Sequence, residues 1–247
     1  MITEEIRQKY PFEQEYEMLE NFCVDYESRR IKIIVQQHSK GKRMLGQNGI
    51  LYLARISHRS NFLFSGFIDN ISKKNSAVLF LILRAHIETT ASLGYFLYNL
   101  KKYYEGTLSF NDINHILYRL SCGSKDIDYR KGKPAIPEAV NVLTMIDSSD
   151  KLIPSEIEET TKDDKPFSKI YTDLSECCHP NSLGLLYGVV VAKGEQFHFS
   201  EKPSLGTTEQ FYFLIENMIL DCYLFFKFYD KCFAFLKKNE NMPKITI

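Results

Sequence analysis

The chain has 247 residues, with 31 basic and 31 acidic side chains and therefore no formal net charge. This length fits one large domain or two small ones, and a composition of 44% hydrophobic and 25% charged residues excludes wholesale disorder. The balanced charge argues against a protein that coats nucleic acid, a task that usually needs a basic excess, but it is compatible with a small nucleotide site.

The first half of the chain has the patterns of helices. Apolar residues recur at helical spacing among charges near the N-terminus, and a basic, partly loop-like segment follows over residues 29–46. Asn75 or Ser76 is a suitable cap for the long apolar helix that ends before Gly106. The helices predicted here cover about residues 4–28, 49–70, 75–104 and 111–120.

The second half is helical with one change of period. β-Branched residues over 185–192 and an alternating pattern over 195–199 surround the turn Lys193-Gly194, which predicts a β-hairpin. The helices predicted in this half cover about residues 138–147, 154–162, 167–178 and 207–238. The predicted fold class is therefore mainly α, a helical bundle with long buried helices and one small β-hairpin.

A single domain is expected over residues 1–247, because nothing after the loop at residues 123–137 resembles an independent core. Within it, residues 1–46 form an N-terminal helix and basic segment. Residues 47–240 form the bundle core, with the hairpin at about 186–199.

Two apolar stretches, residues 77–100 and 211–236, have the length of membrane spans. Charges near their centres, such as Arg84 and Asp221, are costly in lipid, so both stretches are expected to be buried helices and no membrane partner is predicted. The polar, acidic N-terminus does not resemble a signal peptide. The six cysteines lack C-x-x-C spacing, which predicts free, buried thiols and a cytoplasmic protein.

One polar group of residues interrupts the first apolar stretch. Arg84 and Glu88 are four residues apart and share a helix face, whereas His86 lies on another face. Because the helix is apolar nearly all round, at least one of these groups should be buried, and a buried charge must be paired or hydrogen-bonded. The pattern fits either a structural Arg84–Glu88 pair that fixes neighbouring helices or a binding or catalytic pocket.

A second polar group ends the helix predicted over residues 167–178. Tyr171, Ser175 and His179 fall on one face, and Pro180 ends the helix, which places the His179 imidazole beside free carbonyl groups. Asn181 can satisfy nearby backbone groups. The alternative is that His179 only caps the helix and Tyr171 fills the core.

Several catalytic motifs are absent from the sequence. There is no H-E-x-x-H, no G-x-x-x-x-G-K-[ST] and no G-x-S-x-G, so neither a metal site nor a cofactor is predicted. Cys177 is more typical of a small core residue than of a nucleophile.

Together the two polar segments resemble a group of uncharacterised bacterial helical proteins. These proteins carry R-x-x-x-E followed by Y-x-x-L-S-x-x-x-H-P, then a hairpin and a long helix. The resemblance covers roughly residues 50–235. The positions that match are Arg84, Glu88, Tyr171, Leu174, Ser175, His179 and Pro180.

The chain is also distantly similar to the HEPN group of helical bundles, several of which are RNA-cleaving toxins or phage-defence components. Their hallmark is an Arg with a His four to six residues later, which joins two facing subunits into one site. This chain departs from that hallmark, since Arg84 and His86 are separated by one residue and no Arg lies within seven residues before His179. Because of this departure, the similarity implies a bundle architecture and a homodimer but does not support ribonuclease activity; RNA or a nucleotide stays a candidate ligand.

Three functions remain open, and the sequence does not decide whether the protein is an enzyme. In the first, a pocket binds a small polar or anionic ligand through Arg84, Tyr171, Ser175 and Asn181, in a regulatory or phage-defence role. In the second, the protein cleaves RNA without a metal, with His179 as general acid or base, assisted by Arg84 and Glu88. In the third, the polar residues are structural and the protein acts by binding a partner.

Overall fold

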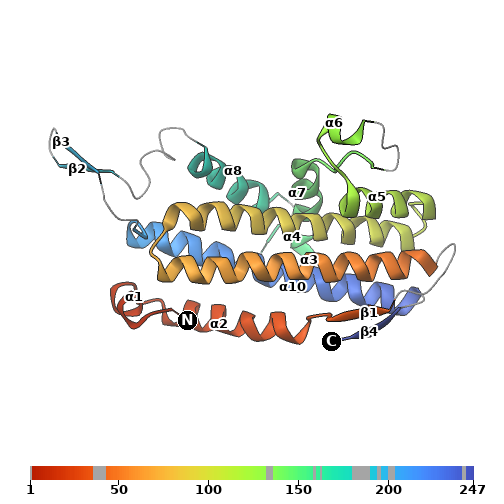
Figure 1. The fold of residues 1–247 in the computed structure, drawn as a ribbon, viewed down its shortest axis with the longest axis horizontal. Coiled ribbons are helices and arrows are strands. Elements are labelled where there is room, and N and C mark those ends of the chain that lie inside the picture. The colour runs from red at the N-terminus through yellow and green to blue at the C-terminus, as the bar shows by residue number, and fades with distance from the viewer. Residues whose placement is uncertain are drawn as a thin grey trace. The chain divides into compact units, whose positions relative to one another are not determined.

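The computed structural model describes residues 2–35, 43–131, 136–157, 160–161, 163–179, 190–193, 196–199, 204–240 and 243–247. Over these residues the fold is mainly α with a small β-hairpin, as the sequence predicts, and it has a second two-stranded antiparallel sheet (Figure 1). The helices are α1 (Glu4–Lys9), α2 (Glu13–Ser28), α3 (Arg43–Ser72), α4 (Ser76–Tyr104), α5 (Phe110–Cys122), α6 (Ile127–Arg130), α7 (Val142–Asp150), α8 (Pro166–Cys178) and α10 (Thr208–Asn239), with a 3-10 turn, η1, at Ile153–Ser155. The strands are β1 (Ile33–Val35), β2 (Val190–Lys193), β3 (Gln196–Phe199) and β4 (Lys244–Thr246).

The chain divides into two compact units, each assembled from three separate stretches. The first unit comprises Met1–Glu27, Arg59–Ile87 and Lys169–Tyr223. The second comprises Ser28–His58, Glu88–Ser168 and Leu224–Ile247. The long helices α3, α4 and α10 each contribute residues to both units. The expectation of a single domain stays a prediction.

The first unit packs aromatic side chains between its helices. Tyr10, at the end of α1, lies 4.8 Å from Phe211 of α10 between ring centroids. In α2, the ring of Tyr26 lies 5.3 Å from that of Phe64 in α3, and Phe22 meets the same Phe64 ring edge-on at 6.4 Å. These contacts bury apolar area, which stabilises the packing of the helices in this unit.

Local sequence sets the helix ends of the first unit. Lys74 adopts a positive φ of 57° after α3, and the Asn75 side chain accepts a hydrogen bond from the Val78 amide at 3.3 Å, which caps α4. At α10, the Thr207 amide donates to the Gln210 side chain at 2.9 Å and the Gln210 amide donates to the Thr207 hydroxyl at 3.3 Å. This reciprocal pair is a capping box that fixes where α10 begins.

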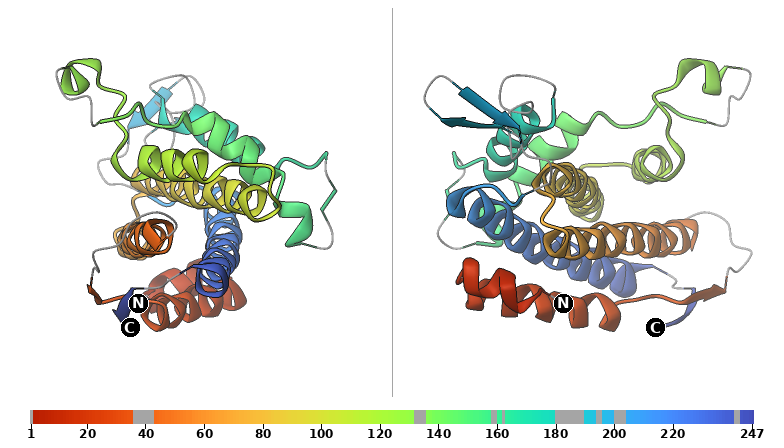
Figure 2. Two further views of the ribbon diagram at one scale, coloured as in Figure 1. Left: turned by 90° about the vertical axis from the view of Figure 1, so that its right-hand side faces the viewer. Right: turned by 60° about the vertical axis from the view of Figure 1, so that its left-hand side comes forward.

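The second unit contains a two-stranded antiparallel sheet that joins distant parts of the chain. Strands β1 and β4 lie side by side near the C-terminus in Figures 1 and 2. They pair in the register Ile33↔Thr246 and Val35↔Lys244. Beside it, the Arg29 guanidinium donates to both carboxylate oxygens of Asp230 at 3.0 Å. These contacts hold the segment that follows α2 against the end of α10.

Two sequence expectations need correction, and one strand pairing was not predicted. The predicted helix over residues 4–28 is two helices, because Pro11 has no amide hydrogen and forces Tyr10 into an extended conformation (φ −128°, ψ 92°). The predicted helix over 154–162 is reduced to the 3-10 turn η1 in the described residues. The pairing of β1 with β4 was not expected, since neither three-residue strand carries a sequence signal of its own.

The hairpin prediction is confirmed in the described residues, where β2 pairs antiparallel with β3. Residues 185–189 of the predicted first strand, and Gly194 of the predicted turn, lie outside the part of the chain that the structure describes.

Over the described residues, α4 is the helix that is long and apolar enough to cross a membrane, by length and composition alone. Its most apolar window has a mean hydropathy of 1.3 and is 56% buried. The core helix of a soluble protein has the same properties, so α4 is weak evidence for a membrane span.

Candidate functional site

Two of the candidate residues, Arg84 of α4 and Tyr171 of α8, lie in contact in the first unit. The Arg84 guanidinium donates through Nη2 to the Tyr171 hydroxyl at 2.9 Å, and its Cζ lies 4.8 Å from the centre of the Tyr171 ring. Tyr171 is buried and Arg84 is half-buried, so the guanidinium lies between the core and solvent. A phenol that both accepts a hydrogen bond and faces the cation holds that cation in one orientation.

The remaining candidates on α8 differ in their surroundings. The Ser175 hydroxyl donates to the Tyr171 backbone carbonyl at 2.7 Å, so its hydrogen is used within its own helix. The His179 amide donates to the Ser175 carbonyl at 3.1 Å, and its side chain is exposed at the end of the helix. Asn181 and Pro180 lie outside the described residues.

Glu88 lies one helical turn beyond Arg84 on α4 and belongs to the second unit, where its side chain is half-buried. Its roles as the partner of Arg84 and as a member of a site with His179 stay predictions.

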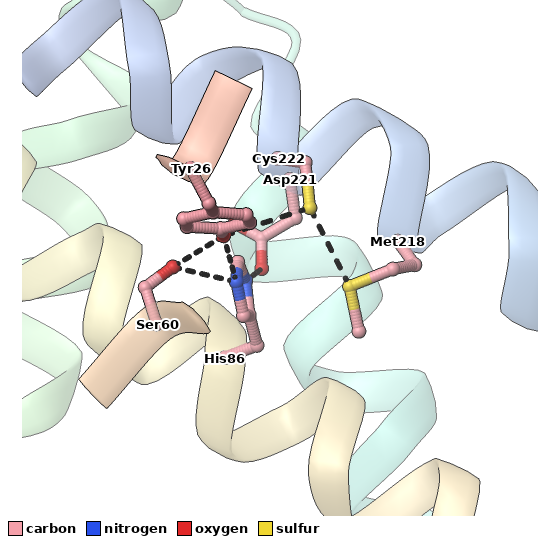
Figure 3. Close-up of polar contacts among 6 residues, drawn as sticks. All are labelled: Tyr26, Ser60, His86, Met218, Asp221 and Cys222. Carbon is pink, nitrogen blue, oxygen red and sulfur yellow. Dashed lines mark hydrogen bonds and ion pairs between the residues drawn. The ribbon is translucent and has the colours of Figure 1, made fainter. Parts of the chain in front are cut away.

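His86, two residues from Arg84, is fully buried and lies in a polar network of the first unit (Figure 3). Its Nδ1 lies 2.6 Å from Oδ2 of Asp221 on α10. Its Nε2 lies 2.7 Å from the Ser60 hydroxyl of α3 and 2.9 Å from the Tyr26 hydroxyl of α2. The two hydroxyls are 2.6 Å apart, so one imidazole joins side chains from three other helices.

The hydroxyl–imidazole–carboxylate order of Ser60, His86 and Asp221 is the one with which hydrolases activate a serine nucleophile. Here Ser60 and His86 have no exposed surface and Asp221 is 1% exposed. A nucleophile must reach its substrate, and Ser60 has no such access in this structure. The network therefore positions helices rather than attacking a substrate.

Burial also sets the protonation of the groups around His86. It raises the pKa of the Tyr26 hydroxyl well above 10.0. It raises the pKa of the Cys222 thiol well above 9.0, and the negative charge of Asp221 adds to that shift. Because both pKa values are raised, the two groups stay neutral at physiological pH. The Tyr26 hydroxyl lies 3.9 Å from the Cys222 sulfur, so they are hydrogen-bonding partners.

One atom of the network has no hydrogen-bond partner. Oδ1 of Asp221 is buried without a donor within the residues that the structure describes. Leaving a buried acceptor unpaired costs about 1–3 kcal/mol, more for a charged group. The contact of Oδ2 with His86 must offset that cost, so the carboxylate depends on its imidazole partner.

Sequence spacing singles out neither Tyr26 nor Ser60 nor Asp221, although the structure places all three around His86. One signal was present, since Asp221 is a lone acid in the apolar run 218–222 of a buried helix. Tyr26 and Ser60 carry no such signal, because hydroxyl-bearing residues are common on helix faces.

The described residues contain no group of three or more His, Cys, Asp or Glu side chains that could hold a metal ion.

All six cysteines are free, as the spacing predicts. Cys222 and Cys232 are buried, but Cys23 and Cys122 are exposed, so the expectation of buried thiols is wrong for those two.

Comparison with models of protein families, with curated proteins and with solved structures found no match for this chain. The case for a function therefore comes from the residues and their geometry.

Proposed function

We propose that the chain is a helical ligand-binding protein that holds a small polar or anionic ligand at Arg84 in the first unit. The contact between Arg84 and Tyr171 carries the proposal, because it orients a half-buried guanidinium at the boundary of the core. A guanidinium in a fixed orientation presents a planar fork of donors that matches phosphate or carboxylate oxygens.

The position of His179 favours a ligand of nucleotide size. His179 lies eight residues after Tyr171, one residue past the end of α8, which corresponds to about 12 Å at the helical rise. A lone phosphate does not span that distance, whereas a nucleotide with two phosphates does. In this proposal Arg84 binds one anionic group and the exposed His179 contacts another part of the ligand, in a regulatory or phage-defence role.

The test uses the purified full chain with three probes: inorganic phosphate, AMP and ADP. We expect ADP to raise the melting temperature most, and Arg84→Gln to weaken its binding at least tenfold in calorimetric titration, because a hydrogen bond to a charged group contributes about 1.5–3 kcal/mol. Arg59→Gln is the control, since Arg59 is an exposed cation of the same unit. Equal ADP binding by Arg84→Gln and the wild type, or no binding of any probe, would contradict the proposal.

The second candidate function is metal-independent RNA cleavage by a homodimer, with His179 as general acid or base. The exposure of His179 at the end of α8 favours it, because a large substrate can approach this imidazole. We expect the full chain to cleave total RNA with and without divalent metals, and His179→Ala to abolish cleavage while the exposed His115→Ala does not. Intact RNA after incubation with the wild type would exclude this function.

A further inference from the structure

The second unit contains a hollow between α3 and α5 that the proposed function does not use. Its volume is about 310 Å³, and an adjoining hollow of about 410 Å³ shares four of its lining residues. The residues on both sides lie at helical spacing, with Asn48, Leu51 and Arg55 on α3 facing Asn114 and Leu117 on α5. Two facing stripes of this kind normally close on each other, but here they leave a cavity of ligand size.

The apolar part of the hollow comes from Leu51 and Leu117, with Tyr118 as an aromatic wall. Leu117 is 2% exposed and therefore belongs to the core, whereas the Tyr118 ring is 42% exposed. An exposed aromatic ring beside a buried leucine offers a flat surface to a flat ligand. The adjoining hollow extends this surface with Phe110.

The charge of the hollow favours an anion. Neither hollow has an acidic lining residue, and Arg55 is the lining residue with a permanent charge. Arg55 is exposed and has no ion pair with any residue that the structure describes. An anion that binds here meets a cation and no carboxylate.

Two amides next to Arg55 add directional groups. The Asn114 amide nitrogen donates to the Phe110 carbonyl at 3.0 Å, which leaves its carbonyl oxygen as an acceptor. Asn48 is exposed on the facing helix. A few polar groups around an apolar surface are typical of a small-molecule site.

We propose that this hollow, in the second unit, binds a small aromatic anion, with the ring system against Leu117 and Tyr118 and the anionic group on Arg55. The site is independent of Arg84 and goes beyond the proposed function. Its volume is near the lower end for ligand pockets, which suits a molecule of one or two fused rings.

The experiment titrates the full chain with 2-naphthoate and compares two matched probes. The neutral amide, 2-naphthamide, tests the charge, and cyclohexanecarboxylate tests the ring. We expect 2-naphthoate to bind at least tenfold more tightly than either probe, and Arg55→Gln to remove the advantage over the amide. Arg59→Gln is the control, since Arg59 is exposed one helical turn further along α3 and does not line the hollow.

Cys122 provides a second measurement that does not depend on a variant. It is an exposed, free thiol that lines the hollow, and Cys23 is an exposed thiol of the first unit. We expect saturating 2-naphthoate to slow alkylation of Cys122 at least fivefold and to leave the rate at Cys23 unchanged.

Equal affinity for 2-naphthoate and 2-naphthamide, unchanged binding by Arg55→Gln, or unprotected Cys122 would each overturn the proposal. A Cys122 thiol that resists alkylation before any probe is added would do the same, because the hollow would then not be open to a small molecule. Arg84→Gln should bind 2-naphthoate like the wild type, so a failure of the first site leaves this one standing.

Discussion

At the scale of single residues, the buried contact between His86 and Asp221 makes Asp221 the most informative side chain to remove. Because the carboxylate and the imidazole depend on each other in a dry interior, we expect Asp221→Ala to lower the free energy of unfolding by about 3–5 kcal/mol. Urea unfolding monitored by circular dichroism measures the loss.

The control for this prediction is on the same helix. Asp230 pairs with Arg29, but its side chain is 54% exposed, so Asp230→Ala should cost no more than about 1 kcal/mol. Equal losses for Asp221→Ala and Asp230→Ala would show that burial of the His86 contact is unimportant for stability.

The raised pKa of Tyr26 predicts that the folded protein becomes less stable at alkaline pH. Its pKa is raised in the folded state, so above pH 10.0 the unfolded chain loses this proton while the folded chain keeps it. The unfolded state then binds fewer protons, and stability must fall as pH rises. Between pH 10 and pH 11, one such group lowers the free energy of unfolding by about 1 kcal/mol.

We therefore expect the free energy of unfolding of Tyr26→Phe to fall by about 1 kcal/mol less than that of the wild type between pH 10 and pH 11. Urea unfolding at the two pH values measures the difference. Phe22→Leu changes the packing around the Phe64 ring that Tyr26 contacts but removes no ionisable group, so it should leave the dependence unchanged. If Tyr26→Phe has the same pH dependence as the wild type, the Tyr26 hydroxyl ionises in the folded protein.

At the scale of elements, two glycines in helices test how closely the helices pack. A Cβ added at Gly94 of α4 would lie 2.2 Å from the Ser149 hydroxyl of α7 and 2.9 Å from the Phe228 ring of α10. A Cβ at Gly66 of α3 would lie 3.6 Å from Ile82, which is ordinary contact. The same substitution therefore meets a clash at one site and an ordinary van der Waals contact at the other.

We expect Gly94→Ala to destabilise the protein by about 1–3 kcal/mol, because overpacking displaces α7 or α10. Gly66→Ala should be neutral or stabilising by up to about 1 kcal/mol, because alanine loses less backbone entropy in a helix. Both values come from chemical unfolding. A stabilising Gly94→Ala would mean that α4 and α7 do not approach as described.

At the scale of the whole molecule, the six cysteines report on the packing of both units. Cys222 of the first unit and Cys232 of the second have no exposed surface, and burial raises the pKa of both thiols, so they should react only when the chain unfolds. Cys23 and Cys122 are exposed and should react first. Brief alkylation of the native chain, followed by peptide mass spectrometry, measures the order. Rapid labelling of Cys222 or Cys232 in the native protein would contradict the fold.

Local patterns in the sequence were sufficient to predict where most of the helices lie. The helix predicted at 167–178 is α8 within one residue at its start, and Asn75 caps α4 as one of the two expected residues. Periodicity and capping are properties of neighbouring residues, which is why they can be predicted without knowledge of the rest of the chain. The apolar surroundings of this helix predicted that at least one of Arg84, His86 and Glu88 is buried, and the structure shows that His86 is the fully buried one.

Contacts between distant segments could not be predicted in this way. His86 meets Tyr26, Ser60 and Asp221 because helices separated by as many as 135 residues pack together, and no spacing within one helix reports on that packing. The pairing of Ile33 with Thr246 and the open hollow beside Arg55 have the same origin. Residue type and spacing therefore determined which helix faces are apolar and where the helices end. The packing of those faces determined which polar side chains meet, because hydrogen bonds between helices depend on positions that only the folded chain sets.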